Sequence, residues 1–101
     1  MKTRVVLFKE DKWWVCVGLD IDFAVQAMTP TQAREEFARL VDLTIQIHEA
    51  NGSIDGFLKS APIEYQERLL YKLKDGGILW EYETGTSGYS FTKEQLNELC
   101  G

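Results

Sequence analysis

Three short hydrophobic runs follow one another at the start of the chain. Residues 4–8 (RVVLF), 13–19 (WWVCVGL) and 23–28 (FAVQAM) all contain β-branched or aromatic side chains, which are enriched in strands. A short polar group at residues 9–12 and a predicted turn at residues 20–22 (Asp-Ile-Asp) separate the runs, a spacing typical of β-hairpins. The pattern therefore predicts an antiparallel three-stranded meander.

The second run is apolar on both faces. Strand alternation puts Trp13, Val15 and Val17 on one face and Trp14, Cys16 and Gly18 on the other. This strand is therefore expected to be central, or covered on both sides. The two adjacent tryptophans cannot point into one core, so one packs under a helix. The other needs a second helix, a dimer mate or a partner protein, for which Trp is a favoured anchor.

The periodicity then changes to that of a long amphipathic helix. Thr29 is a good N-cap, Pro30 suits the first helical position, and Asn51-Gly52 is a typical C-terminal stop. Glu35 and Arg39 form an i,i+4 pair on the outer side. The inner stripe has 3 and 4 spacing and consists of Ala33, Phe37, Leu40, Val41, Thr44, Ile47 and His48.

The second half of the chain is less regular. Residues 53–62 are interpreted as a loop that packs back on the core, and residues 63–77 as a second helix. Residues 78–84 alternate as a fourth strand, residues 85–88 break it, and Thr92 with Gln95 starts a short last helix. The inner side of the second helix is predicted to be Ile63, Leu69, Leu70 and Leu73.

These elements predict one α+β domain over residues 1–101, a three-stranded antiparallel meander plus a fourth strand packed against one long helix. Its parts are a β-β-β-α core (1–52), a loop and second helix (53–77), the fourth strand (78–84) and a tail helix (85–101). The size of the chain suffices for a single core without obligatory metals or disulfides.

Net charge narrows the classes of partner. The chain carries 11 Lys and Arg against 16 Asp and Glu, for a net charge of -5. Nucleic-acid binding depends on clustered Lys and Arg side chains that neutralise phosphates. The excess of acidic side chains therefore speaks against a chain that binds nucleic acid over its whole surface. An acidic surface instead suits a basic protein partner.

The cysteines and the apolar runs exclude further classes. Cys16 and Cys100 provide neither a disulfide framework nor a zinc ligand set, and Cys16 is expected to be a buried free thiol. Charged residues directly follow Met1, and no run approaches the roughly 20 apolar residues of a membrane span. We expect a cytoplasmic protein without metal or cofactor.

Candidates for catalysis are few. The clustered carboxylates Glu10, Asp11, Asp20 and Asp22 lie in predicted turns, where acidic residues are common for backbone reasons. Asp20 and Asp22 could share a cation. His48 is the only histidine, and no Ser or Cys motif marks a nucleophile beside it. The sequence predicts a non-enzymatic protein.

Residues 4–50 resemble the HicB-like antitoxin family. The third predicted strand reads Ala-Val-Gln-Ala (24–27), and Thr-Pro-Thr-Gln-Ala-Arg-Glu-Glu-Phe (29–37) follows it closely. Residues 27–29 replace the Gly-Asp-Thr of the family, and residues 22–23 replace its Gly-Cys. Residues 56–69 look like the tail of stand-alone HicB-like proteins. The residues that fit family positions are Gln26, Thr29, Ala33, Glu35 and Glu36.

The resemblance implies a β-β-β-α-β partial RNase H-like domain that inhibits a small basic ribonuclease toxin by covering its active surface. Many family members also bind their own promoter through a C-terminal DNA-binding segment. Residues 85–101 are too few for a helix-turn-helix, and charge is nearly balanced over residues 63–74. Both features speak against DNA binding.

The predicted partner surface combines exposed aromatic and acidic side chains: Trp14, Asp20, Asp22, Glu81 and Tyr82. Two alternatives stay open. The chain could be a self-associating, homo-oligomeric HicB-like domain without a toxin. It could also be an acidic mobile-element inhibitor that imitates the phosphate charge bound by another nucleic-acid enzyme.

Overall fold

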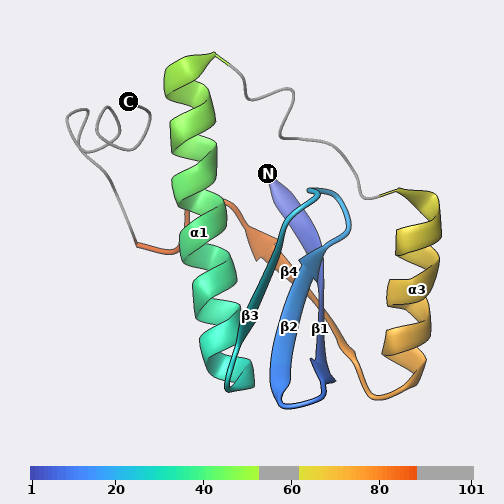
Figure 1. Cartoon of the computed structure of the whole chain (residues 1–101). Coiled ribbons are helices and arrows are strands. Elements are labelled where there is room, and N and C mark those ends of the chain that lie inside the picture. The colour runs from blue at the N-terminus through green and yellow to red at the C-terminus, as the bar shows by residue number, and fades with distance from the viewer. Residues whose placement is uncertain (53–61, 89–101) are drawn as a thin grey trace.

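A four-stranded antiparallel sheet in the order β3-β2-β1-β4 forms the centre of the computed structural model, which describes residues 1–52 and 62–88 (Figure 1). The chain's first three strands form the predicted meander, and the fourth returns to pair antiparallel with the first. The α+β class is confirmed. The strands are β1 (Lys2–Glu10), β2 (Trp13–Gly18), β3 (Ala24–Ala27) and β4 (Ile78–Glu83).

The turn between β1 and β2 is tighter than residues 9–12 suggested. Glu10 already pairs with Trp13, so only Asp11 and Lys12 make the turn. Asp11 has a φ of 57°, in the left-handed region that Asp tolerates better than most residues. The hairpin register is thereby fixed, with Leu7 opposite Cys16.

Helix α1 (Pro30–Asn51) begins and ends where the sequence predicts. The Thr29 side chain accepts a hydrogen bond from the Gln32 N–H at 3.1 Å, and Gly52 ends the helix with a φ of 69°. Arg39 forms an ion pair of 2.8 Å with Glu36, three residues before it, whereas the sequence predicts Glu35, four residues before it, as the partner.

The buried stripe of α1 is shorter than predicted. Ala33, Phe37 and Val41 are fully buried, whereas the predicted members Leu40, Thr44, Ile47 and His48 are only half-buried. The last turns of α1 extend past the sheet, so the sheet does not cover them (Figure 1).

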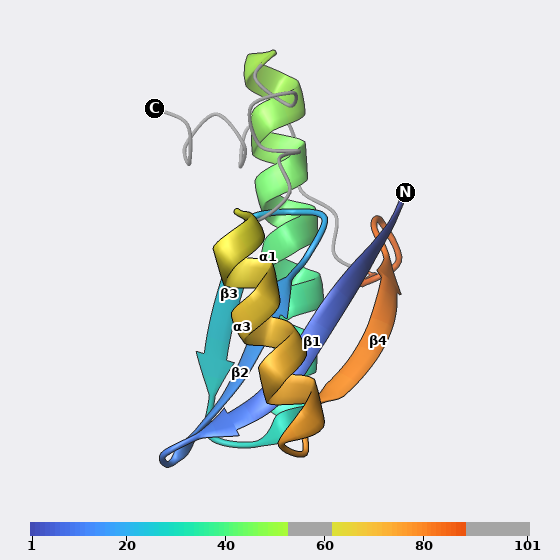
Figure 2. The same ribbon diagram turned by 90° about the vertical axis from the view of Figure 1, so that its right-hand side faces the viewer.

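The two faces of the sheet carry separate cores, as the apolar faces of β2 predict. On the α1 side, Phe37 packs among Val5, Leu7 and Cys16, and on the other side Leu69 packs among Val6, Phe8 and Val17. Helix α3 (Ile63–Lys74) supplies Leu69 and lies across the face opposite to α1 (Figure 2). Residues 53–61 and the predicted tail helix lie outside the described residues.

The predicted inner side of α3 is wrong in two of its four residues. Leu69 is buried and Leu73 packs against it, but Ile63 and Leu70 are 72% and 53% exposed. Successive helical residues are turned by about 100°, so Leu70 points along the sheet when Leu69 points into it. A short helix on a flat sheet buries one narrow stripe.

Leu69→Ala and Leu70→Ala form a matched test of this arrangement. We expect Leu69→Ala to lower the free energy of unfolding by about 2–5 kcal/mol because it opens a cavity. Leu70→Ala should change it by less than about 0.5 kcal/mol. Urea denaturation followed by circular dichroism measures both, and equal losses would contradict the observed face of α3.

Candidate partner-binding surface

The two tryptophans lie on opposite faces of β2, as alternation requires. Trp14 is half-buried and packs against the core on the α1 side. Trp13 is on the other face and its ring lies 5.7 Å from the Lys12 ammonium. Trp14 is therefore the tryptophan that the helix covers, and Trp13 is the better placed of the two for a partner.

Tyr82 is placed in the core. Its side chain is on the α1 side of β4 and is 8% exposed. The hydroxyl donates a hydrogen bond of 2.5 Å to Oδ2 of Asp42 on α1. Burial raises the pKa of Tyr82 above its ordinary value of about 10, and the Asp42 carboxylate raises it further. The edge strand thus uses this aromatic for anchoring.

Asp42 is a buried acceptor that the sequence reasoning missed. It is 3% exposed, and the N–H groups of Gly85 and Ser87 donate to its carboxylate at 2.7 and 3.1 Å. Together with the Tyr82 hydroxyl these bonds join α1 to the end of β4. The only sign of this role in the sequence is that Asp42 directly follows Val41, within the stripe of inner positions predicted for the helix.

Asp20 and Glu81 lie on either side of Arg4. The Arg4 Nη2 bonds Asp20 Oδ1 at 2.8 Å, and the Arg4 main-chain N–H bonds Asp20 Oδ2 at 2.8 Å. These bonds lower the pKa of Asp20. Glu81 is directly opposite Arg4 in the β1–β4 register, and Glu83 is opposite Lys2. The result is a row of alternating charges, which we call the charge ladder: Asp20, Arg4 and Glu81.

The charge ladder lies on the α3 side of the sheet. Arg4 shares a face with Val6 and Phe8, which pack under α3. Two of the five predicted partner-surface residues, Asp20 and Glu81, are therefore brought together, although they are 61 positions apart in the chain. Glu81 and Glu83 are exposed, so the β4 end of this row is acidic and accessible.

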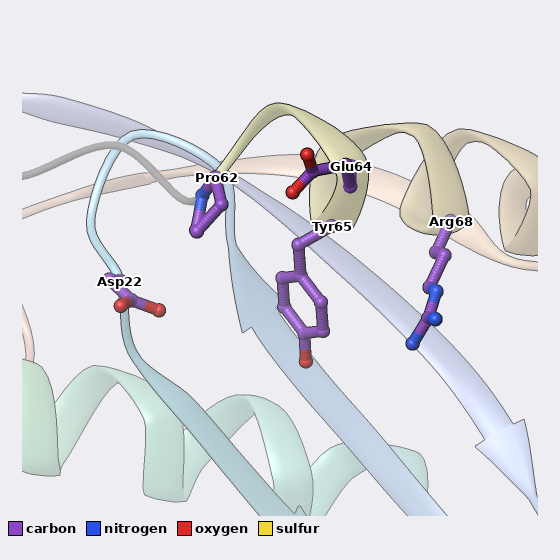
Figure 3. Close-up of a pocket in the computed structure, with 5 residues that line it drawn as sticks. All are labelled: Asp22, Pro62, Glu64, Tyr65 and Arg68. Atoms are coloured by element: carbon purple, nitrogen blue, oxygen red, sulfur yellow. The ribbon is translucent and has the colours of Figure 1, made fainter.

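Asp22 belongs to a different place. With Pro62, Glu64, Tyr65 and Arg68 it lines a cavity of about 410 Å³ between the turn after β2 and the first half of α3 (Figure 3). Tyr65 and Arg68 project from α3 on the side of Asp22 (Figure 3). The lining has two carboxylates, one guanidinium and a phenol, which suits hydrogen bonding to a polar group without selecting one sign of charge.

A second hollow, of about 310 Å³, lies between α1 and β4. Trp80, Arg34 and Glu35 are among its lining residues, and the Arg34 guanidinium stacks 4.8 Å from the centre of the Trp80 ring. The sequence reasoning did not single out either residue of this stacked pair, because they are 46 positions apart. We call this hollow the Trp80 groove.

Groups that could bind a metal or act as nucleophiles are few among the residues that the structure describes. Among residues 1–52 and 62–88, no group of three His, Cys, Asp or Glu side chains is placed to hold a metal ion. Cys16 is a buried free thiol, as expected, and burial raises its pKa to about 12. Such a thiol stays protonated at neutral pH and is a poor nucleophile.

Within residues 1–52 and 62–88, no helix combines the length and apolarity that crossing a membrane requires.

Comparisons with known proteins add no relative. No protein-family model matches the chain, and no curated protein or solved structure matches it significantly. The resemblance to HicB-like antitoxins therefore stays a prediction.

The raised pKa of Tyr82 predicts how stability depends on pH. The folded chain holds the phenolic proton more tightly than the unfolded chain. This contribution to stability is therefore complete below about pH 10 and is lost as the pH rises through the folded-state pKa. Absorbance titration of phenolate in the wild type and in Tyr82→Phe should show that the missing tyrosine ionises above about pH 10. Ionisation at or below that pH would contradict the buried Tyr82–Asp42 contact.

Proposed function

We propose that this chain is a non-enzymatic, protein-binding inhibitor of the HicB-like antitoxin kind. Its partner is a small basic ribonuclease, which it inhibits by covering the surface that binds RNA. The observation that carries the proposal is the exposed acidic end of the charge ladder, Glu81 with Glu83, on the edge strand of the sheet. A nuclease binds the RNA backbone with basic side chains, to which this edge is complementary.

The mechanism is occlusion. Glu81 and Glu83 attract the basic surface and raise the association rate, as charge complementarity does generally. Next to them, Ile78 and Leu79 are each 52% exposed on the same strand. Burial of these apolar side chains would slow dissociation. Differences in the dissociation rate account for most differences in affinity between related complexes. Trp14 and Tyr82 would act indirectly by holding the sheet in place.

The mechanism needs no cofactor, because it works by excluding RNA from the nuclease. The proposed setting is the cytoplasm, where such a ribonuclease meets its RNA. Asp22 lies in the segment between β2 and β3, and β3 is at the opposite edge of the sheet from β4. Asp22 and its polar cavity therefore form no part of the proposed contact.

A self-associating domain is the second candidate. Helix α3 exposes Ile63, Leu70 and Tyr71, the last of them 71% exposed. Exposed apolar patches often mark contacts between proteins, and these side chains could meet those of another copy. This candidate predicts an oligomer and no second protein.

A pull-down from the native host tests the proposal. The tagged full chain is captured after nuclease treatment, and bound proteins are identified by mass spectrometry. A stoichiometric small basic protein, whose ribonuclease activity the purified chain abolishes, is the expected result. Recovery of the chain alone as a salt-resistant oligomer would favour self-association. Salt-sensitive capture of a large nuclease complex would favour the phosphate-imitating inhibitor.

Charge reversal on the edge strand should weaken the complex. We expect Glu81→Lys to raise the Kd for the ribonuclease about tenfold, or about 1.4 kcal/mol, mainly through slower association. Glu49→Lys is the matched control, since Glu49 is exposed on the last turn of α1, away from the sheet. Surface plasmon resonance at low and high salt measures both variants. An equal effect of the two would show that only net charge matters.

A further inference from the structure

The outer edge of β4 bears on how a partner would be held. β4 ends the sheet order β3-β2-β1-β4, and within residues 1–52 and 62–88 no strand pairs with its outer side (Figure 2). The six residues of β4 contain no proline. An edge without proline and without a neighbouring strand can accept another strand through main-chain hydrogen bonds.

The register identifies which main-chain groups of β4 face outward. The Thr84 N–H donates to the Met1 carbonyl at 2.9 Å, so this pair is a hydrogen-bonded one. Bonded and non-bonded pairs alternate along an antiparallel ladder. The main-chain groups of Leu79, Glu81 and Glu83 therefore point away from β1. The Glu83 carbonyl already accepts a hydrogen bond of 2.6 Å from the Thr86 hydroxyl, so the open part of the edge is centred on Glu81. The 2.9 Å bond from the Leu19 N–H to the Arg4 carbonyl agrees, because it turns Arg4 toward β2 and away from Glu81.

The charge ladder indicates what kind of strand fits this edge. Its signs alternate across the sheet, from Asp20 through Arg4 to Glu81. Side chains opposite one another on adjacent strands interact directly, and opposite charges there are stabilising. A strand added beyond β4 places its own side chain next to Glu81, where a Lys or Arg would continue the alternation. A Lys or Arg next to Glu83 would continue the alternation in the same way, because Glu83 lies opposite Lys2 on β1.

The other face of the added strand meets the apolar side chains of Ile78 and Trp80, with the Arg34 guanidinium stacked on the Trp80 ring. Alternate side chains of such a strand would lie on the α1 side, beside Ile78 and Trp80. Ile78 is 52% exposed and is the apolar contact that this face offers at its start. The Trp80 groove beside it, of about 310 Å³, adds Trp80 and Ala38 to a lining that is otherwise polar. This face favours apolar side chains, so the fitting sequence alternates between basic and apolar residues.

We propose that the free edge of β4 binds an extended segment of the partner as an added antiparallel strand, with basic side chains next to Glu81 and Glu83 and apolar ones over Ile78 and Trp80. The proposal rests on the proposed function only for the basic character of the partner. A second copy of β4 fits less well, because the strand contains no basic side chain. Antiparallel pairing centred on Glu81 would put two carboxylates opposite each other, which is destabilising, and pairing centred on Trp80 would put Leu79 opposite Glu81.

Synthetic peptides test the edge without knowledge of the partner. The probe is a short capped peptide of alternating Lys and Val, and its twin has Glu in place of Lys. We expect the Lys peptide to bind the full chain at least about tenfold more tightly than the Glu peptide, as measured by fluorescence anisotropy. Net charge alone could cause that preference, so the decisive probes change the backbone.

N-methylation removes main-chain donors and leaves charge intact. In an antiparallel arrangement the Lys opposite Glu81 turns its amide toward β4, whereas the Val amides face away. Methylating the Lys amides should abolish binding, and methylating the Val amides is the matched control. If both methylated peptides bind like the parent, the contact is electrostatic only and the proposal fails.

A variant of the chain tests the same bond from the other side. Glu81→Pro removes an N–H that faces outward, which an edge strand tolerates, and Glu81→Gln removes the charge alone. Peptide affinity should fall further in Glu81→Pro than in Glu81→Gln, with unchanged circular dichroism confirming that both fold. Equal affinities would overturn the proposal.

Two results separate this proposal from the proposed function. If the pull-down finds a ribonuclease but the peptides do not bind at the edge of β4, the proposed inhibition is supported and strand addition is wrong. If light scattering shows a dimer that Glu81→Pro makes monomeric, the edge is occupied by a second copy and the proposal is wrong.

Discussion

Strand β1 is hydrogen-bonded on both edges and buried on both faces, and the other elements are placed by their contact with it. Val5, Val6, Leu7 and Phe8 are consecutive and all are at most 7% exposed. Burial of each such side chain stabilises the fold by roughly 1.5–3 kcal/mol, which is a large fraction of the net stability of a small domain, about 5–15 kcal/mol. Alternation sends Val5 and Leu7 to α1 and Val6 and Phe8 to α3. A sheet with β1 at an edge could not cover all four.

The central position of β1 explains why the edge strand β4 needs an anchor of its own. β4 pairs on one side only, so its position depends on β1 and on contacts with α1. Tyr82 and the turn after β4 supply those contacts by donating three hydrogen bonds to the buried Asp42 carboxylate. A buried carboxylate is costly unless its oxygens are bonded. The strand that presents Glu81 is thus held from the side opposite to its exposed charges.

The charge ladder contributes more to geometry than to stability. The side chains of Arg4 and Asp20 are 54% and 34% exposed, and a surface ion pair of this kind contributes about 0–1 kcal/mol. Asp20 nevertheless fixes Arg4 by accepting bonds from both its main chain and its guanidinium. Arg4 in turn faces Glu81 across the non-bonded pair of the ladder, where side chains lie closest. The exposed acidic edge therefore has a defined place on the sheet.

The sequence by itself determined the elements whose signals are local. The meander, the limits of α1 from Thr29 to Gly52, the opposite placement of Trp13 and Trp14, and the fourth strand all follow from periods of 2 and 3.6 residues and from capping chemistry. Tertiary structure alone decided that β4 lies beside β1, and only this pairing puts Glu81 next to Arg4 and Tyr82 on Asp42. It also selected Leu69 over Leu70 as the buried residue of α3. Contacts between positions 40 or more residues apart depend on which apolar faces meet, and no local pattern in a single sequence records that choice.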